Sequence, residues 1–206
     1  MAHYFDEQPD VASDRRTIDV ALPDIAFTME TDRGVFSHGH LDTGTSLLLR
    51  EAPAPPADGH LLDLGCGAGP IAVAMALRSP DAHVIAVDTN ERALDLTRRN
   101  AARNNVGNIT VSAPHDVPAD MVFDAIWSNP PIRIGKAALH DLLGGWLERL
   151  RPGGAATLVV QKHLGADSLH RWLEGRGLPT QRIASRAGFR LLQVTAPSPG
   201  GIDRDP

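Results

Sequence analysis

The chain has little of several residue types, and each shortage excludes a class of protein. Among its 206 residues there is one cysteine, Cys66, and aromatic residues make up 4% of the sequence. A single cysteine excludes an internal disulfide and a zinc site built from several cysteines, and it fits a reducing compartment. No run of about 18 uncharged apolar residues offers a membrane-spanning helix. Residues 1–10 lack the basic and apolar regions of a signal peptide, so we expect a cytoplasmic protein without a membrane partner.

The length suits one sizeable α/β domain with a well-buried core. The formal net charge of −5 is unfavourable for binding nucleic acid, but it is unevenly distributed. Residues 1–30 hold seven acidic and two basic side chains and supply the whole charge of −5, so residues 31–206 are balanced. Arginines between residues 165 and 195 can form a local basic surface or remain scattered and solvated. These arginines are Arg171, Arg176, Arg182, Arg186 and Arg190.

Residues 1–57 form an extension ahead of the main pattern. Alternating apolar residues predict two short strands, over 17–22 and 25–31, that pair as a β-hairpin. A short helix is expected from Thr43 to Glu51, and the proline-rich segment 52–57 is expected to form a stiff linker.

Residues 58–195 alternate apolar runs with helical patterns, which is typical of a parallel sheet covered by helices on both faces. The clearest helix is predicted over 136–150, where apolar side chains recur with helical spacing. Residues 151–154 (Arg-Pro-Gly-Gly) are expected to stop it, and the tail 196–206 is expected to be disordered. Strands are expected at 60–64, 83–88, 108–112, 123–128 and 155–160, followed by an antiparallel pair at 181–185 and 189–194.

A glycine-rich turn follows the first of these strands. Asp63 lies in the apolar strand and is followed at alternate positions by Gly65, Gly67 and Gly69, and then by a helix that starts near Pro70. Glycine permits positive φ and has no Cβ, so a ligand can lie against the backbone at the N-terminus of the helix. Strand-to-helix turns also use glycine for steric reasons, so the turn alone is weak evidence.

Asp88 ends the next expected strand. There it can accept hydrogen bonds from both hydroxyls of a ribose, or it can cap the helix that begins near Asn90. The glycine spacing is GxGxG, whereas dinucleotide-binding turns prefer GxGxxG. The Asp63 carboxylate would repel a pyrophosphate and suits a cation such as S-adenosylmethionine, which carries an ammonium and a sulfonium.

The fourth strand of the domain ends in Ser128-Asn129-Pro130-Pro131. Two prolines fix two φ angles, so we expect a rigid turn whose carbonyls point outward rather than pair within the chain. In one interpretation, the Asn129 side-chain oxygen and the carbonyl of Ser128 or Pro130 accept hydrogen bonds from a planar NH₂ group. Positioning and electrostatics then supply most of the rate without a strong base. The other interpretation is a rigid turn that only closes a strand.

Together these residues resemble class I S-adenosylmethionine-dependent methyltransferases, in the subgroup whose Asn-Pro-Pro motif methylates exocyclic or amide nitrogens. The flanking segments are similar to the ribosomal RNA small subunit guanine-N2 methyltransferase C family and its short single-domain relatives. Within residues 3–195, these segments are His3-Tyr4-Phe5, Arg16-Thr17-Ile18, residues 34–37 and 41–49, residues 129–133, and Gly135-Lys136. The resemblance implies a Rossmann-like α/β fold with a seven-stranded, mostly parallel sheet, helices on both faces and an N-terminal β-hairpin.

The resemblance also implies roles for individual residues. Contacts to S-adenosylmethionine would come from Asp63, Gly65, Cys66, Gly67, Asp88, Thr89, Thr43, Gly44, Thr45 and Asp116. Asn129, Pro130 and Pro131 would form the catalytic turn, and Phe36, Ile132 and Arg133 would face the substrate. Many family members have Phe or Tyr after the prolines to stack on the target base, whereas this chain has Ile132, so Phe36 is the candidate substitute.

By the same resemblance, the partner would be RNA, specifically ribosomal RNA, and the acceptor the N2 amino group of a guanine. Two alternatives stay open: another acceptor, such as a protein glutamine, a DNA adenine or a metabolite amine, or a non-catalytic cofactor-binding RNA assembly factor. The protein-glutamine motif usually ends in Tyr, which Ile132 does not match. His38 and His40 form a His-x-His pair, a pattern found more often in solvated loops than in metal sites, so we expect solvated loop residues and no metal. The oligomeric state stays open.

Overall fold

The computed structural model of the chain describes residues 11–198. Its strands are β1 (Arg16–Ala21), β2 (Ala26–Thr31), β3 (His60–Leu64), β4 (His83–Val87), β5 (Ile109–Ser112), β6 (Phe123–Ser128), β7 (Leu150–Gln161), β8 (Thr180–Arg186) and β9 (Phe189–Thr195). Its helices are α1 (Thr43–Glu51), α2 (Pro70–Arg78), α3 (Glu91–Arg103), α4 (Lys136–Leu147) and α5 (Ala166–Gly175), with single 3-10 turns η1 (Pro114–Asp116), η2 (Ile132–Ile134) and η3 (Lys162–Leu164).

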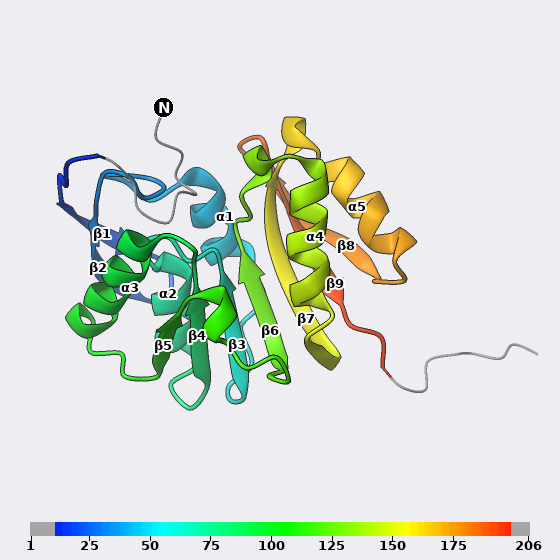
Figure 1. Cartoon of the computed structure of the whole chain (residues 1–206), viewed down its shortest axis with the longest axis horizontal. Helices are drawn as coiled ribbons and strands as arrows, with labels where there is room; N and C mark the ends of the chain where they lie inside the picture. The colour runs from blue at the N-terminus through cyan, green and yellow to red at the C-terminus, as the bar shows by residue number, and fades with distance from the viewer. Residues whose placement is uncertain (1–10, 199–206) are drawn as a thin grey trace, which may run out of the picture.

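Seven strands form one sheet in the order β5-β4-β3-β6-β7-β9-β8. The pairs from β5 to β7 are parallel, and β9 runs antiparallel to both of its neighbours. The separate β1–β2 hairpin lies beside α3, at the left in Figure 1. The α/β fold with a mostly parallel sheet, covering helices and an N-terminal hairpin is therefore confirmed.

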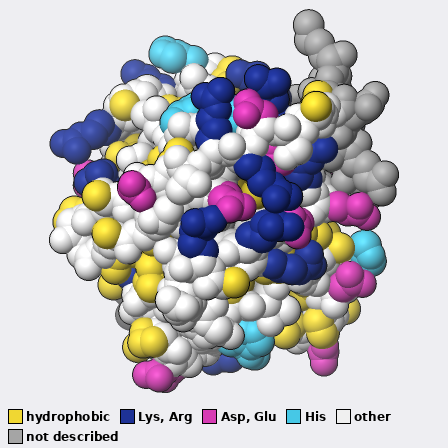
Figure 2. All heavy atoms as spheres, turned by 90° about the vertical axis from the view of Figure 1, so that its left-hand side faces the viewer, with side chains coloured by type: hydrophobic (Ala, Val, Ile, Leu, Met, Phe, Trp, Pro, Cys, Tyr) yellow, Lys and Arg dark blue, Asp and Glu magenta, His cyan; other side chains and the backbone are white. Residues whose placement is uncertain are grey.

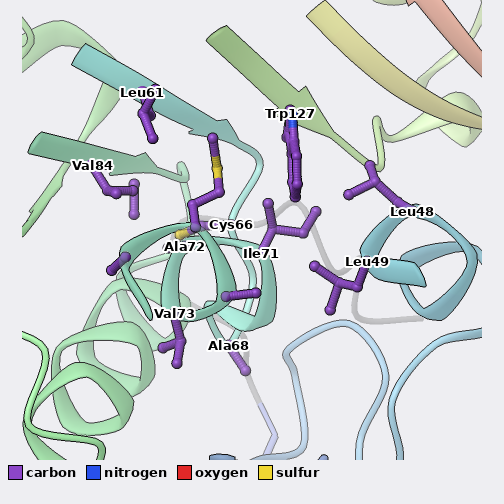
Figure 3. Packing of buried hydrophobic residues seen from close by; sticks show 14 of the residues in the cluster. Leu48, Leu49, Leu61, Cys66, Ala68, Ile71, Ala72, Val73, Val84 and Trp127 are labelled. Carbon is purple, nitrogen blue, oxygen red and sulfur yellow. The ribbon is translucent and has the colours of Figure 1, made fainter. Parts of the chain in front are cut away.

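Side chains that alternate along the strands bury two separate faces of the sheet. Leu61, Val84 and Trp127 pack with α1, α2, α3 and the hairpin, whereas Leu62 and Ile126 pack with α4 and α5. Figure 3 shows Trp127 of β6 directed toward Ile71 of α2, beside Leu48 and Leu49 of α1. This apolar contact fixes the start of α2, and with it the glycine turn that precedes the helix.

The end of α4 differs from the prediction. The helix stops at Leu147, and residues 151–154 lie inside β7 instead of forming a helix stop. Leu150 falls at the next apolar position of the helical spacing, and it is buried, but it belongs to β7 and pairs with Phe123 in the sheet. The register then shifts, and the extra residues of β7 form a bulge. A Cβ at Gly154 would lie 2.9 Å from the carbonyl oxygen of Arg151, so glycine is required within this bulge.

Two asparagines hold the hairpin against α3. The Asn104 side chain accepts a hydrogen bond from the Thr28 N–H (3.1 Å) and donates one to the Thr28 carbonyl (2.8 Å). Asn100 makes the same pair of bonds with Glu30, at 2.7 and 2.9 Å. The asparagines lie one helical turn apart, and Thr28 and Glu30 lie two residues apart on β2. Each side-chain amide therefore bonds to both backbone groups of one β2 residue, as the backbone of an adjacent strand would.

The expected disorder of the tail does not begin at Ala196. This residue is buried, its N–H donates to the Gly154 carbonyl (2.8 Å), and its carbonyl accepts from the Gly153 N–H (3.2 Å). The rest of the predicted tail from residue 199 lies outside the described residues, as does the His3-Tyr4-Phe5 segment. In residues 11–198, no helix has the length and apolar character needed to cross a membrane.

Candidate functional site

A cleft opens at the carboxyl ends of β3, β4 and β6. One wall is the glycine turn after β3, and Asp88 and Asn129 contribute from the ends of β4 and β6. The opposite wall comes from the N-terminal segment, through Ile18, Met29, Val35, Phe36, Leu41 and Asp42. The hairpin therefore builds part of the site.

The three glycines of the turn have different surroundings. All have positive φ, 77° at Gly65, 56° at Gly67 and 84° at Gly69. A Cβ at Gly65 would meet nothing within 4 Å, and one at Gly67 would meet only Val35, at 4.0 Å. A Cβ at Gly69 would lie 2.8 Å from Thr97 of α3. Gly65 and Gly67 therefore leave backbone open to a ligand, whereas Gly69 allows α3 to pack closely.

Asp88 connects the glycine turn to the start of α3. One carboxylate oxygen accepts from the Gly67 N–H and the other from the Asn90 N–H, both at 2.9 Å. The cap of α3 is Asn90, whose side chain accepts from the N–H groups of Arg92 and Ala93. This leaves the capping alternative for Asp88 unsupported. Burial raises the pKa of the Asp88 carboxyl, although these hydrogen bonds oppose the rise.

Asp63 lies beneath the turn, and its side chain is not part of the cleft wall. It is fully buried, and one oxygen accepts from the Ala72 N–H of α2 (2.9 Å). The other oxygen is buried and has no hydrogen-bond partner among residues 11–198. Burial raises the pKa of this carboxyl to about 8, so it holds its proton at neutral pH when no cation lies nearby.

Asn129 is held by two residues at the start of α1. Its side-chain Nδ2 donates to Oδ2 of Asp42 (2.8 Å) and to Oγ1 of Thr45 (3.0 Å). Within residues 11–198, no donor reaches its side-chain oxygen, Oδ1. Because the two N–H bonds are used, the amide can offer the cleft an acceptor.

The carbonyls of the two prolines are paired, contrary to the expectation. The Ile132 N–H donates to the Pro130 carbonyl (2.9 Å) and the Ile134 N–H to the Pro131 carbonyl (3.2 Å). The Pro130 carbonyl is paired by an inverse γ-turn at Pro131, whose backbone has φ −74° and ψ 77°. The Pro131 carbonyl is paired by η2, the short helical turn that begins directly after the prolines. Ser128 is buried, and its hydroxyl donates to the Leu64 carbonyl (2.7 Å), which ties β6 to β3.

The structure brings about half of the predicted site residues together. Those on the cleft wall are Phe36, Thr45, Gly65, Cys66, Gly67, Asp88 and Asn129. Those outside the wall are Thr43, Gly44, Asp63, Thr89, Asp116, Pro130, Pro131, Ile132 and Arg133. Asp116 is 66% exposed in η1, beside His115, and Gly44 packs against the Phe189 ring. All these roles stay predictions.

Several cleft residues were missing from the sequence prediction. Ile18 and Met29 belong to the hairpin, whose alternating pattern predicted buried side chains but not which part of the domain they cover. Asp42 precedes a predicted helix and caps it, since its side chain accepts from the Thr45 N–H. That position was a signal for a cap, and only the folded chain shows its contact with Asn129.

His38 is not a solvated loop residue. It is 20% exposed, its Nε2 lies 2.6 Å from the Asp14 carbonyl, and it is 3.7 Å from the Asp14 carboxylate. The sequence interpretation failed because this acidic partner is 24 residues away. Across the part of the chain that the structure describes, no three His, Cys, Asp or Glu side chains gather as metal ligands would.

Three of the arginines between residues 165 and 195 are paired with acidic side chains. Arg190 is largely buried and paired with Asp167, Arg176 pairs with Glu148, and Arg186 pairs with Glu51. Figure 2 shows Lys and Arg side chains gathered, with acidic ones among them, on the side of the molecule that carries the hairpin and α3. The exposed arginines of this hairpin–α3 face are Arg15, Arg16, Arg33, Arg98, Arg99 and Arg103.

The fold and the cleft together define the class of S-adenosylmethionine-dependent methyltransferases. The chain belongs to the methyltransferase small domain family, whose model matches residues 26–193. It is 36% identical over 195 residues to the uncharacterized protein YbxB of Bacillus subtilis (strain 168), an alignment that covers 93% of this chain and 97% of that protein.

Other relatives are longer. The chain is 34% identical over 191 residues to ribosomal RNA small subunit methyltransferase C of Pseudomonas aeruginosa (strain LESB58), covering 91% of this chain and 56% of that protein. The chain thus spans about half the length of the curated relatives with that name. A similar structure is the 16S rRNA N2 methyltransferase of T. thermophilus in complex with AdoMet and guanosine, with a TM-score of 0.74, 25% identity, and coverage of 88% of this chain and 50% of that chain. A methyltransferase from Pyrococcus furiosus shares the fold, with a TM-score of 0.63 at 22% identity over 80% of this chain and 90% of that chain.

S-adenosylmethionine is the cofactor of this enzyme, and the described residues fit it. The open backbone at Gly65 and Gly67 leaves room where a side chain would intrude. Asp88 would accept from the ribose hydroxyls, and the apolar wall around Met29 and Val35 would cover the adenosine. The unpartnered oxygen of Asp63 suits a positively charged ligand near the turn.

Proposed function

We propose that the protein methylates the exocyclic N2 amino group of a guanine in ribosomal RNA, in the cytoplasm. The observation that carries an amino acceptor is the Asn129 amide. Its N–H bonds are taken by Asp42 and Thr45, so it can offer the substrate an acceptor and not a donor. An amino group has hydrogens to donate to it, whereas a carbonyl oxygen has none.

The chemistry needs orientation more than a base. S-adenosylmethionine supplies a methyl group bound to a sulfonium sulfur. The acceptor nitrogen forms the new N–C bond as the C–S bond breaks, and the nitrogen then loses a proton to water. A hydrogen bond from the amino group to Asn129 Oδ1 holds the lone pair in line and stabilises the positive charge that develops on nitrogen. With the Pro130 carbonyl paired to Ile132, the Ser128 carbonyl is the candidate second acceptor.

Guanine is supported by the relatives and by one exposed aromatic side chain. The structural relative from T. thermophilus is described as a complex with guanosine. In this chain, Phe36 lines the cleft and is 49% exposed, so it can stack on a base. Ile132, which follows the two prolines, is half-buried and packs against the core on the α4 side, so in this proposal it borders the base without stacking on it.

An RNA partner is supported by the relatives' names and by the hairpin–α3 face. Arg33 lies two residues before Val35 of the cleft wall, so the arginines of this face adjoin the site. Phosphate binding by arginine would hold the RNA while one base enters the cleft. In the same proposal, Arg133, exposed after the Asn-Pro-Pro turn, contacts the RNA from the other side.

The test uses ribosomal particles and total RNA from a strain that lacks the gene. With labelled S-adenosylmethionine, the wild-type protein should label one guanine at N2, and Asn129→Ala should not. Label on protein, DNA or small molecules without label on RNA would refute the proposal and favour another acceptor. RNA binding and normal cell function with Asn129→Ala, without methyl transfer, would instead favour an assembly factor.

A further inference from the structure

We infer that Asp42 is a positioning residue for methyl transfer, because its carboxylate fixes which end of the Asn129 amide faces the acceptor. The inference rests on the proposed function, in which Asn129 accepts a hydrogen bond from an amino group. Asp42 lies 87 residues before Asn129 and belongs to neither the glycine turn nor the Asn-Pro-Pro turn.

The Asp42 carboxylate serves two groups at once. As the N-cap of α1, its Oδ2 accepts from the Thr45 N–H at 2.9 Å, and the same oxygen accepts from Asn129 Nδ2 at 2.8 Å. The helix behind it is firmly placed, since Leu48 and Leu49 are buried in the core. The acceptor oxygen is therefore held by a rigid element rather than by a mobile loop.

A side-chain amide has almost the same shape after half a turn about its last bond, so its orientation depends on its partners. A carboxylate only accepts hydrogen bonds, so Asp42 selects the orientation in which Nδ2 faces it. The Thr45 hydroxyl accepts the second N–H at 3.0 Å. In the reversed orientation, Asn129 would present N–H groups to the amino hydrogens of the substrate, which would repel them.

Helix capping and amide orientation can be separated by substitution. Asp42→Ser keeps a good cap residue for α1 but shortens the side chain that reaches Asn129. Asp42→Asn keeps both the cap and an oxygen that can accept from Asn129, so it is the conservative control. Thr45→Val removes the second acceptor at nearly unchanged shape, and Thr45→Ser restores a hydroxyl.

The first measurement is the kinetics of methyl transfer to the acceptor that the labelling experiment identifies. Asp42→Ser and Thr45→Val should both lower kcat by roughly 10- to 100-fold, because the acceptor is misplaced. Asp42 is not among the predicted cofactor contacts, so Asp42→Ser should change the KM for S-adenosylmethionine little. Asp42→Asn and Thr45→Ser should keep most of the kcat, and all four variants should melt near the wild-type temperature. Wild-type kcat in both Asp42→Ser and Thr45→Val would overturn the inference, as would equal losses in all four variants.

The second measurement needs no methyl acceptor. In protein labelled with ¹⁵N at asparagine, the side-chain NH₂ signal of Asn129, assigned with Asn129→Ala, should be protected from solvent exchange, and Asp42→Ser and Thr45→Val should remove that protection. Unchanged exchange in both variants would overturn the role of Asp42. Lost protection together with an acceptor other than guanine would refute the guanine assignment while supporting the positioning role.

Discussion

Asn100 of α3 is bound to Ala68 of the glycine turn, at a distance of 2.8 Å between its side-chain Nδ2 and the Ala68 carbonyl oxygen. The same amide pairs with both backbone groups of Glu30 in the hairpin. Asn100 is fully buried. One side chain thus joins the cofactor turn, the helix and the hairpin, so the shape of the turn depends on Glu30, a hairpin residue 38 positions before Ala68.

Asn100→Ala should weaken both the fold and cofactor binding. The substitution leaves the Glu30 N–H and the Ala68 carbonyl without their partner, so we expect a loss of about 2–3 kcal/mol in the free energy of unfolding. It also releases the turn, so S-adenosylmethionine should bind more weakly. Urea denaturation and calorimetric titration measure the two effects.

The matched control is Asn104→Ala, one helical turn away. Asn104 bonds to Thr28 of the hairpin and to the Asn100 carbonyl of its own helix, but not to the glycine turn. It should cost stability with a smaller loss of affinity. If the two variants lost cofactor affinity equally, the link through Ala68 would have no specific effect on binding.

Gly65→Ala and Gly69→Ala should fail in different ways. Both place a side chain at positive φ, which costs about 1–2 kcal/mol. At Gly65 the new methyl group enters open space where the cofactor would lie, so binding should fall sharply while the protein still folds. At Gly69 it meets Thr97 at 2.8 Å, so the loss of stability should be larger. Melting temperature and cofactor affinity, measured together, distinguish the two; equal melting temperatures would contradict the packing role of Gly69.

Local patterns predicted the elements well, because burial periodicity and turn residues act over a few positions. The helix from Thr43 to Glu51 has the predicted ends, and most strands differ from the prediction by one residue. The predicted helix end at residue 150 was wrong for a local reason too: Leu150, a buried residue of β7, happens to continue the apolar spacing of the helix. The cleft was harder to predict: its glycine turn carries its own signal, whereas the contact of Asp42 with Asn129 joins distant segments through tertiary packing.

Removing charge from the hairpin–α3 face should weaken RNA binding. We expect the triple variant Arg33→Gln, Arg98→Gln, Arg99→Gln to bind RNA less tightly, with a salt dependence reduced by about one unit of slope per lost phosphate contact. Affinity for S-adenosylmethionine should be unchanged. Filter binding at several salt concentrations measures the slope.

The control for this face changes the same amount of charge elsewhere. Arg171→Gln, Arg182→Gln, Arg186→Gln removes three exposed arginines near α5 and β8. That variant should bind RNA much as the wild type does. Equal weakening by both triple variants would mean that net charge matters and that the hairpin–α3 face has no special role.

The buried Asp63 carboxyl should make the stability of the ligand-free protein depend on pH. Its pKa is about 8 in the folded chain, against 3.8 for an ordinary aspartate. Between these values the folded state binds more protons than the unfolded state. The free energy of unfolding should therefore fall as the pH rises, by at most about 1.4 kcal/mol per unit. The stabilisation is complete below about pH 4 and lost above about pH 8.

Asp63→Asn isolates this effect, because the amide oxygen can still accept from the Ala72 N–H and the side chain cannot ionise near neutral pH. Urea denaturation of both proteins at about pH 5, 6.5 and 8 should show the wild type losing stability relative to the variant as the pH rises. Asp120→Asn, the same change at an exposed position, should leave the pH dependence as in the wild type. If the difference between wild type and Asp63→Asn stayed constant over this range, Asp63 would already be ionised in the fold. S-adenosylmethionine, the cation that the turn is expected to bind, would then find the Asp63 carboxylate charged before binding.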